Sequence, residues 1–169
     1  FSDLYKALTK NKDDLQAVKP NLARAKAQTE KHFKDYHLPT DKKIFTKVLG
    51  TYYEDMPPAL HLGIFDLIEK KYKNDFNRFA DVVFSKSILT SAEKVNNFFE
   101  KPSLKVLNKD LGFQTMQSIL YSYRNTIIPN SQKDRDKLRE TQRHYIAGLS
   151  EMYADKNFYP DANFTMRLT

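Results

Sequence analysis

The chain has 169 residues, which fits one domain or part of one. It contains 4 glycines and no tryptophan, and its 28 Lys and Arg residues against 21 Asp and Glu residues give a net charge of +7. Because glycine supplies hairpin turns, phosphate-binding loops and the turns that carry serine nucleophiles, this composition argues against an all-β fold, a dinucleotide-binding domain and a self-contained hydrolase of common design.

Helical periodicity covers the first half of the chain, and prolines mark its breaks. The first predicted helix spans 4–22, with a kink or a new start at Pro20, and an alanine-rich helical stretch continues to Tyr36. A break follows at 37–40. Three further helices are predicted from apolar residues at helical spacing: Ile44, Val48, Leu49 and Tyr52, ending before Pro57; Leu60, Ile64, Leu67, Ile68 and Tyr72; and Phe76, Phe79, Val82 and Val83.

The second half also favours helices. Thr90 followed by Glu93 predicts a capping box, which would open a short helix that ends at Pro102. A longer helix is predicted to stop near Pro129, and Ser131 is the predicted N-cap of the last one. The last helix carries residues that alternate four and three apart, which is typical of a helix packed along another helix: Leu138, Gln142, Tyr145, Leu149 and Met152.

The end of the chain breaks the helical pattern. Phe164, Met166 and Leu168 alternate with polar residues, which is strand periodicity, and we expect the partner strand to belong to a segment outside this chain. We therefore predict an all-α array of about eight helices over 1–155, and a loop with a short orphan strand-like tail over 156–169. Since the chain begins at Phe1 and has no signal-peptide pattern, we interpret it as a processed product or an excised segment of a longer protein.

The sequence shows no constellation of catalytic residues. The four histidines, His32, His37, His61 and His144, follow no metal-binding spacing, and the first two lie about 140° apart around a helix. The adjacent acids 13–14 and 54–55 point in different directions on a helix, no serine lies in a Gly-x-Ser-x-Gly setting, and there is no cysteine. We expect no catalytic, cofactor-binding or metal-binding residue in this chain and no cofactor. A helical enzyme that uses His61 or His144 as a base is the minor alternative.

The positive charge has two interpretations. The densest basic stretch, 19–34, spreads its cations over about half of the helix circumference, which is typical of a solvated surface. We therefore expect no nucleic-acid partner. The alternative is a basic α-helical binding module for nucleic acid or an acidic protein partner. The mean hydropathy of −0.67, without an apolar run of about 18 residues, predicts no membrane span.

Two blocks near the end of the chain carry a family resemblance. Residues 143–149, with the sequence RHYIAGL, and residues 158–169, with the sequence FYPDANFTMRLT, resemble exported bacterial serine dipeptidyl-peptidases of the types called seven and eleven. Residues 42–57, residues 71–99 and the turn at 102–103 agree with the resemblance. Phe164 stands where the family often has serine.

The resemblance implies a specific place for the chain in a longer parent protein. In that family a chymotrypsin-like double β-barrel carries the Ser, His and Asp triad, and an inserted helical domain caps the cleft, so that dipeptides are removed from peptide N-termini. By this resemblance residues 1–155 are a helical cap subdomain, incomplete at its N-terminal side, and residues 156–169 re-enter the barrel. The triad then lies outside this chain, which is expected to be inactive alone.

The resemblance also implies partners and a location. The partners would be the barrel of the same protein and, through the parent, peptide substrates. The parent would be periplasmic, cell-surface or secreted. Because an unpaired strand invites edge association, a homodimer through residues 164–169 is also possible.

Overall fold

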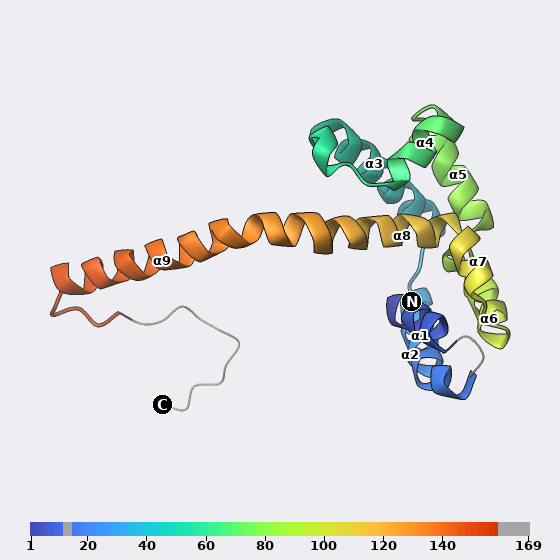
Figure 1. The fold of residues 1–169 in the computed structure, drawn as a ribbon, viewed down its shortest axis with the longest axis horizontal. Helices are drawn as coiled ribbons and strands as arrows, with labels where there is room; N and C mark the ends of the chain where they lie inside the picture. Colours follow the sequence, from blue (N-terminus) through green and yellow to red (C-terminus); the bar gives the residue numbers. More distant parts are fainter. Residues whose placement is uncertain (12–14, 159–169) are drawn as a thin grey trace. The chain divides into compact units, whose positions relative to one another are not determined.

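The computed structural model describes residues 1–11 and 15–158, and these contain helices and no strand. The predicted all-α class is confirmed, whereas the predicted strand at 164–169 lies outside the described residues. Short turns of other helix types connect some of the α-helices: η1 (Pro58–Leu60), η2 (Ile88–Thr90) and the π-helical η3 (Tyr123–Ile127). The α-helices are α1 (Ser2–Lys10), α2 (Leu15–Phe33), α3 (Leu38–Asp55), α4 (Ile64–Tyr72), α5 (Phe76–Lys86), α6 (Ala92–Glu100), α7 (Leu104–Lys109), α8 (Leu111–Ser122) and α9 (Ile128–Met152) (Figure 1).

The chain divides into two compact units, residues 1–126 and residues 127–169. The first unit holds α1 to α8, and the described part of the second unit, 127–158, holds α9. The predicted boundary between 155 and 156 depends on a barrel outside this chain, so it stays a prediction.

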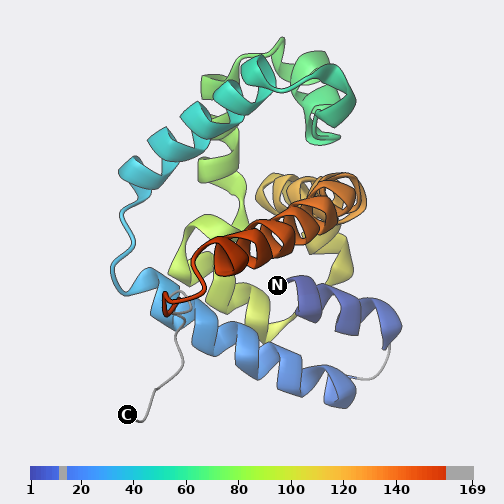
Figure 2. The same ribbon diagram turned by 90° about the vertical axis from the view of Figure 1, so that its left-hand side faces the viewer.

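One core of the first unit forms where α1, α2, α6, α7 and α8 meet. α1 and α2, both drawn in blue, lie side by side, and α6 packs on α2 (Figure 2). Phe98 and Phe99 come from α6, and the ring of Phe1 stacks on that of Phe99 with centroids 5.7 Å apart. The buried residues of this core are Leu4, Leu8, Val18, Ala25, Val95, Phe98, Phe99, Leu107 and Phe113.

A second core lies between α3, α4 and α5. Phe45 of α3 packs edge-on against Phe84 of α5, with ring centroids 5.4 Å apart. The buried residues of this core are Leu49, Leu62, Ile64, Phe65, Ile68, Phe79, Ala80, Val83 and Phe84. Thus the helices predicted from 44–52, 60–72 and 76–83 do build one core, although 60–72 divides into η1 and the shorter α4.

The predicted inward face of α3 is partly wrong. Ile44 and Val48 are 56% and 58% exposed, whereas Phe45 and Leu49 face the second core. Apolar residues occupy two faces of this helix. The face with the aromatic ring of Phe45 is the one that packs against α5, because it buries more apolar surface.

A buried carboxylate joins the two cores. Asp110 is 8% exposed, and its Oδ1 accepts hydrogen bonds from Ser87 Oγ and from the backbone N–H of Phe113, both at 2.8 Å. Its Oδ2 accepts from the backbone N–H of Ile88 at 2.7 Å. Asp110 therefore caps the N-terminus of α8 and ties it to the segment that follows α5.

Two predicted helix starts are wrong for the same physical reason. The N-cap of α6 is Ser91, because the hydroxyl of Thr90 donates instead to the carbonyls of Phe84 and Ser87. Ser131 lies inside α9, where its hydroxyl donates to the carbonyl of Ile128. In neither place does the hydroxyl accept the helix N–H that the sequence pattern assigned to it; each hydroxyl donates to a nearby carbonyl.

Prolines interrupt the helices less than predicted. Pro20 lies within α2, which begins earlier, at Leu15, and α1 ends at Lys10, so 4–22 is not one helix. Pro39 and Pro129 each lie in the first turn of a helix, α3 and α9 respectively. A first-turn N–H has no intrahelical partner, and so a proline there costs no hydrogen bond.

The described part of the second unit is exposed. α9 has no buried residue, and Leu138, Tyr145 and Met152 are 57%, 65% and 73% exposed. Within 127–158 no other helix packs on this face, so the predicted helical partner of α9 is not found among these residues. None of the helices in the described part of the chain combines the length and apolar content needed to cross a membrane.

Substitution of Gly112 tests the joint around Asp110. A Cβ added at Gly112 would lie 2.5 Å from Ser87 Oγ and 3.2 Å from Ser87 Cβ. We expect Gly112→Ala to lower the free energy of unfolding by about 1–3 kcal/mol, as overpacking does in other cores. Chemical denaturation followed by circular dichroism measures this change.

Gly50→Ala is the matched control. Its added Cβ would lie 3.8 Å from Phe76 Cδ2, an ordinary contact, so the better helix propensity of alanine should raise stability by up to about 1 kcal/mol. Combining Gly112→Ala with Ser87→Ala should cost less than the sum of the two single changes, because the 2.5 Å contact is removed. Equal effects of the two glycine substitutions would contradict the packing described for Gly112.

Candidate functional site

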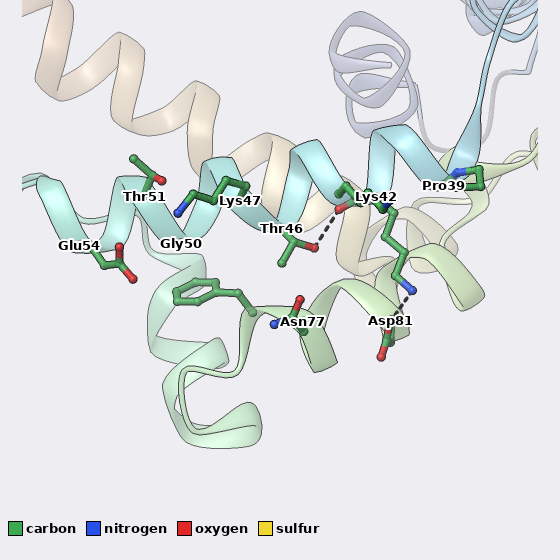
Figure 3. A pocket seen from close by; sticks show the side chains of 11 residues that line it. Pro39, Lys42, Thr46, Lys47, Gly50, Thr51, Glu54, Asn77 and Asp81 are labelled. Atoms are coloured by element: carbon green, nitrogen blue, oxygen red, sulfur yellow. Dashed lines mark hydrogen bonds and ion pairs between the residues drawn. The ribbon is translucent and has the colours of Figure 1, made fainter.

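A groove lies between α3 and α5. Its volume is about 590 Å³, and the two helices are the main contact within the second core. Figure 3 shows the side chains of both helices that point toward it. The lining residues are Pro39, Lys42, Lys43, Thr46, Lys47, Gly50, Thr51 and Glu54 from α3, and Phe76, Asn77 and Asp81 from α5.

The start of α5 is held in place against α3. Lys73 and Asn74 both adopt the left-handed conformation, with φ of 54° and 59°, and this reverses the chain after α4. Asn74 Nδ2 then donates to the hydroxyl of Tyr53 on α3 at 3.2 Å. The carboxylate of Asp75 accepts from the backbone N–H of Arg78 and caps α5. Phe76 and Asn77, the next two residues in the chain, form part of the groove wall.

The start of α3 is also held by side chains. The hydroxyl of Tyr36 donates to Asp41 Oδ2 at 2.9 Å, and His37 Nδ1 shares a 2.8 Å hydrogen bond with Thr40 Oγ1. Burial, and next the hydrogen bond to Asp41, raises the pKa of the Tyr36 phenol. The phenol therefore stays protonated under ordinary conditions and holds the first turn of α3.

The charges of the groove are arranged along α3. Lys42 Nζ forms an ion pair with Asp81 Oδ1 across the groove at 2.5 Å, and both side chains are more than a third exposed (Figure 3). An exposed pair of this kind contributes about 0–1 kcal/mol to stability. Lys43 and Lys47 lie on the same wall, and Glu54 lies toward the other end of α3. The groove thus contains the Lys42–Asp81 ion pair, the cations of Lys43 and Lys47, and the carboxylate of Glu54.

The polar groups that line the groove are not arranged for nucleophilic catalysis. Thr46 Oγ1 donates to the carbonyl of Lys42 in its own helix, so a hydroxyl that lines the groove is already engaged. The carboxylate of Asp81 is engaged by Lys42, and no lining hydroxyl has a histidine or a carboxylate at hydrogen-bond distance. Nucleophilic catalysis needs such a base beside the nucleophile. Its polar and charged lining makes this groove a candidate surface for a ligand with polar or charged groups.

His61 and His144 lie far apart in the chain and have different surroundings. His61 Nε2 donates to the carbonyl of Met56 at 2.9 Å, and its ring lies 4.8 Å from that of Tyr53, centroid to centroid. His144 Nε2 lies 4.0 Å from a carboxylate oxygen of Glu140, and both side chains are exposed. His61 is therefore packed among aromatic rings and anchors the end of α3, which is a structural position.

His32 packs against the rings of Phe33 and Tyr36, with centroids 5.0 and 5.1 Å away, and His37 is the N-cap residue of α3. Among residues 1–11 and 15–158 no three His, Asp or Glu side chains are grouped so as to hold a metal ion. Of the adjacent acids, 13–14 lies outside the described residues, and 54–55 forms the end of α3, where only Glu54 lines the groove.

The sequence did not predict this groove. Its polar residues come from two helices whose lining segments are separated by more than twenty positions in the sequence. On each helix these residues have the pattern of a solvated face. One signal was present: Gly50 lies in the middle of a helix, where glycine costs about 1 kcal/mol relative to alanine. Its missing side chain leaves space beside Phe76.

Comparison with known proteins gives the chain's relatives. It is 31% identical over 170 residues to the dipeptidyl-peptidase 7 of Phocaeicola vulgatus. This match covers 99% of this chain and 23% of the relative. It is 32% identical over 173 residues to the Asp/Glu-specific dipeptidyl-peptidase of Porphyromonas gingivalis, again with 99% and 23% covered. The chain thus spans about a quarter of the length of these relatives, and it is related to bacterial dipeptidyl-peptidases.

The family follows from the same comparison. The family model named peptidase S46 matches residues 2–169, which is nearly the whole chain, and the chain belongs to this family. The resemblance predicted from residues 143–149 and 158–169 is therefore confirmed.

Alkaline titration tests the contact at the start of α3. Because the folded-state pKa of Tyr36 is raised above its ordinary value of 10.0, the stability it contributes is fully present below that pH. This stability is lost as pH rises through the folded-state pKa. Absorbance titration of the phenols should show a late phase that Tyr36→Phe removes. Tyr121→Phe, at a 71% exposed position, is the control and should leave the late phase in place. A late phase unchanged in Tyr36→Phe would contradict the contact with Asp41.

Proposed function

We propose that the chain is the non-catalytic helical cap of an exported serine dipeptidyl-peptidase that removes dipeptides from peptide N-termini. Membership of the peptidase S46 family and relatives named as dipeptidyl-peptidases support this proposal. The cap would exclude long substrates sterically and leave the reaction to a barrel that lies outside this chain. The parent would be periplasmic, cell-surface or secreted.

The observation that carries the proposal is the apolar stripe of α9, defined as Leu138, Tyr145, Leu149 and Met152. These residues alternate as one face of a helix that packs along a partner. Leu138, Tyr145 and Met152 are more than half exposed. A row of exposed apolar side chains marks an interaction surface. Such a face is expected on a segment of a larger protein, because another part of the parent would pack against the stripe.

In this proposal the chain binds and restricts the access of peptides, and it takes no part in the chemical reaction. The α3–α5 groove lacks a nucleophile paired with a base, as described above, and the histidines of the described residues hold structural or exposed positions. A cap acts by restricting which part of a peptide reaches the catalytic groups, and this requires rigid surfaces. The basic-module alternative has no comparable support: one of the three lysines of the groove is already paired with Asp81.

A peptidase assay tests the non-catalytic role. The 169-residue chain should not hydrolyse dipeptidyl substrates, because the α3–α5 groove has no hydroxyl paired with a base and the hydroxyl–carboxylate pair of Ser87 and Asp110 is buried, and the intact parent should hydrolyse them. Circular dichroism checks that the isolated chain is folded. Hydrolysis by the isolated chain would contradict the cap assignment, and an inactive parent would contradict the peptidase assignment. Binding of the chain to heterogeneous DNA that persists at physiological salt would favour the basic-module alternative.

Charge substitution tests the stripe of α9. In the intact parent, Tyr145→Glu should lower the melting temperature and the activity, because a carboxylate would enter a covered apolar contact. Ala147→Glu is the matched control, since it adds the same charge on the opposite face of α9, where Ala147 is exposed. Thermal unfolding and initial rates give the comparison.

The isolated chain completes this test. There Tyr145→Glu and Ala147→Glu should behave alike, because both positions are already exposed. Equal effects of the two substitutions in the parent would contradict the covered stripe. A dimer of the isolated chain that only Tyr145→Glu dissociates, measured by sedimentation, would assign the stripe to a second copy of the chain instead.

A further inference from the structure

A second groove of the first unit lies between α4 and α8. Its volume is about 560 Å³, close to that of the α3–α5 groove. α8 supplies one wall, and α1, α4 with the preceding Gly63, and Asn108 of α7 supply the rest. The lining residues are Tyr5, Gly63, Ile64, Leu67, Asn108, Phe113, Gln114, Gln117, Ser118 and Tyr121.

The lining of this groove carries no formal charge. Charged residues make up 29% of the chain, and the α3–α5 groove of similar volume is lined by five of them. Charged side chains are found mainly at protein surfaces, because water solvates them well. An uncharged groove therefore complements a ligand that has no charge where it lies in the groove.

The groove offers amide and hydroxyl groups along one helix face. Gln114 Nε2 donates to the carbonyl of Asn108 at 2.7 Å, which orients that amide. The carbonyl oxygen of Gln114, the amide of Gln117 and the hydroxyl of Tyr121 have no hydrogen-bond partner among the described residues. A glutamine amide both donates and accepts, which matches the N–H and C=O of a peptide bond. Residues three and four apart on α8 lie on the same face.

The spacing of these groups fits an extended chain. From Gln114 to Tyr121 the helix rises about 10 Å, at about 1.5 Å per residue. An extended peptide covers about three residues in that length. Tyr121 is 71% exposed, so its ring is available to pack against a ligand.

The floor of the groove is rigid and its mouth is open. The backbone N–H of Ile64 donates to Ser118 Oγ at 3.0 Å and fixes α4 to α8, and buried Phe113 packs against the ring of Tyr5. Gly63 has φ of −59° and ψ of −20°, which any residue adopts. A Cβ there would meet Ser118 Oγ at 3.7 Å, an ordinary contact. The backbone does not require glycine at this position, and its missing side chain leaves the mouth open.

We propose that the α4–α8 groove binds the main chain of an uncharged, extended stretch of a peptide. The ligand is a peptide supplied from solution, and the groove recognises its peptide bonds and not its side chains. This inference rests on the proposed function, because a cap that meets peptides of many sequences can hold them by the groups that all peptides share.

Titration with a neutral peptide tests this site. The probe is trialanine that is acetylated at its N-terminus and amidated at its C-terminus, added to the 169-residue chain and followed by the amide shifts of α8. Gln117→Ala should weaken binding roughly three- to tenfold, the effect of one lost hydrogen bond. Gly63→Phe should abolish binding by filling the mouth. Lys26→Ala, at an exposed position of α2 that lines neither groove, is the control and should leave binding unchanged.

Three outcomes would overturn the proposal: binding that Gly63→Phe and Gln117→Ala leave intact, tighter binding of a trilysine or triglutamate probe, or binding by the isolated chain that the intact parent lacks. The last would mean that a segment of the parent itself occupies the groove.

Kinetics of the parent separate this proposal from the proposed function. Gln117→Ala should raise KM for peptides extended by neutral residues and leave kcat unchanged, because the group acts in binding. A parent without peptidase activity contradicts the proposed function, whereas an active parent with an unchanged KM contradicts only the groove.

Discussion

The buried carboxylate of Asp110 is the contact on which both grooves depend. It accepts hydrogen bonds from Ser87, Ile88 and Phe113, so the end of α5 and the start of α8 share one acceptor. Hydrogen bonds to a charged group contribute about 1.5–3 kcal/mol each, and donors left unpaired in this position are costly. α5 forms one wall of the α3–α5 groove, and α8 forms one wall of the α4–α8 groove. The two grooves are therefore positioned by the same buried contact.

Glycine is scarce in this chain, and its role is to leave out a side chain where neighbouring groups approach closely or a groove is open. None of the four glycines has a positive φ, so none is required by the backbone conformation. Gly112 allows α8 to approach Ser87, and Gly50 and Gly63 lie in the linings of the two grooves. The count alone favours a helical fold, because few turns are built on glycine. The positions of Gly50, Gly63 and Gly112 carry separate information, since they mark where a helix packs closely or lines a groove.

Most helices could be predicted from periodicity, whereas the faces they bury could not. α5 carries a narrow apolar face, and of its predicted residues Phe79 and Val83 are buried, whereas Phe76 and Val82 are half-buried. α3 has apolar residues on two faces, so local spacing could not choose between Ile44 and Phe45, and packing against α5 decided it. The grooves could not be predicted, because their lining comes from separate helices and consists of residues that are also typical of a solvated surface. Thr90 failed as a predicted cap because its hydroxyl bonds carbonyls of the preceding segment, a contact that exists only once η2 has formed.

Under the proposed function, the exposed features of this chain serve as surfaces for binding. The stripe of α9 lacks a covering element among residues 127–158, and the hydroxyl of Thr46 in the α3–α5 groove is bonded to its own helix. A catalytic site needs converging groups with strained or shifted properties, which cost stability. A cap avoids that cost, because its contribution is to hold rigid walls at fixed positions. Under the proposed function, the glycine-containing turns of the catalytic site would belong to a barrel outside this chain, and the helices of this chain would supply rigid walls, which agrees with a chain that has only 4 glycines.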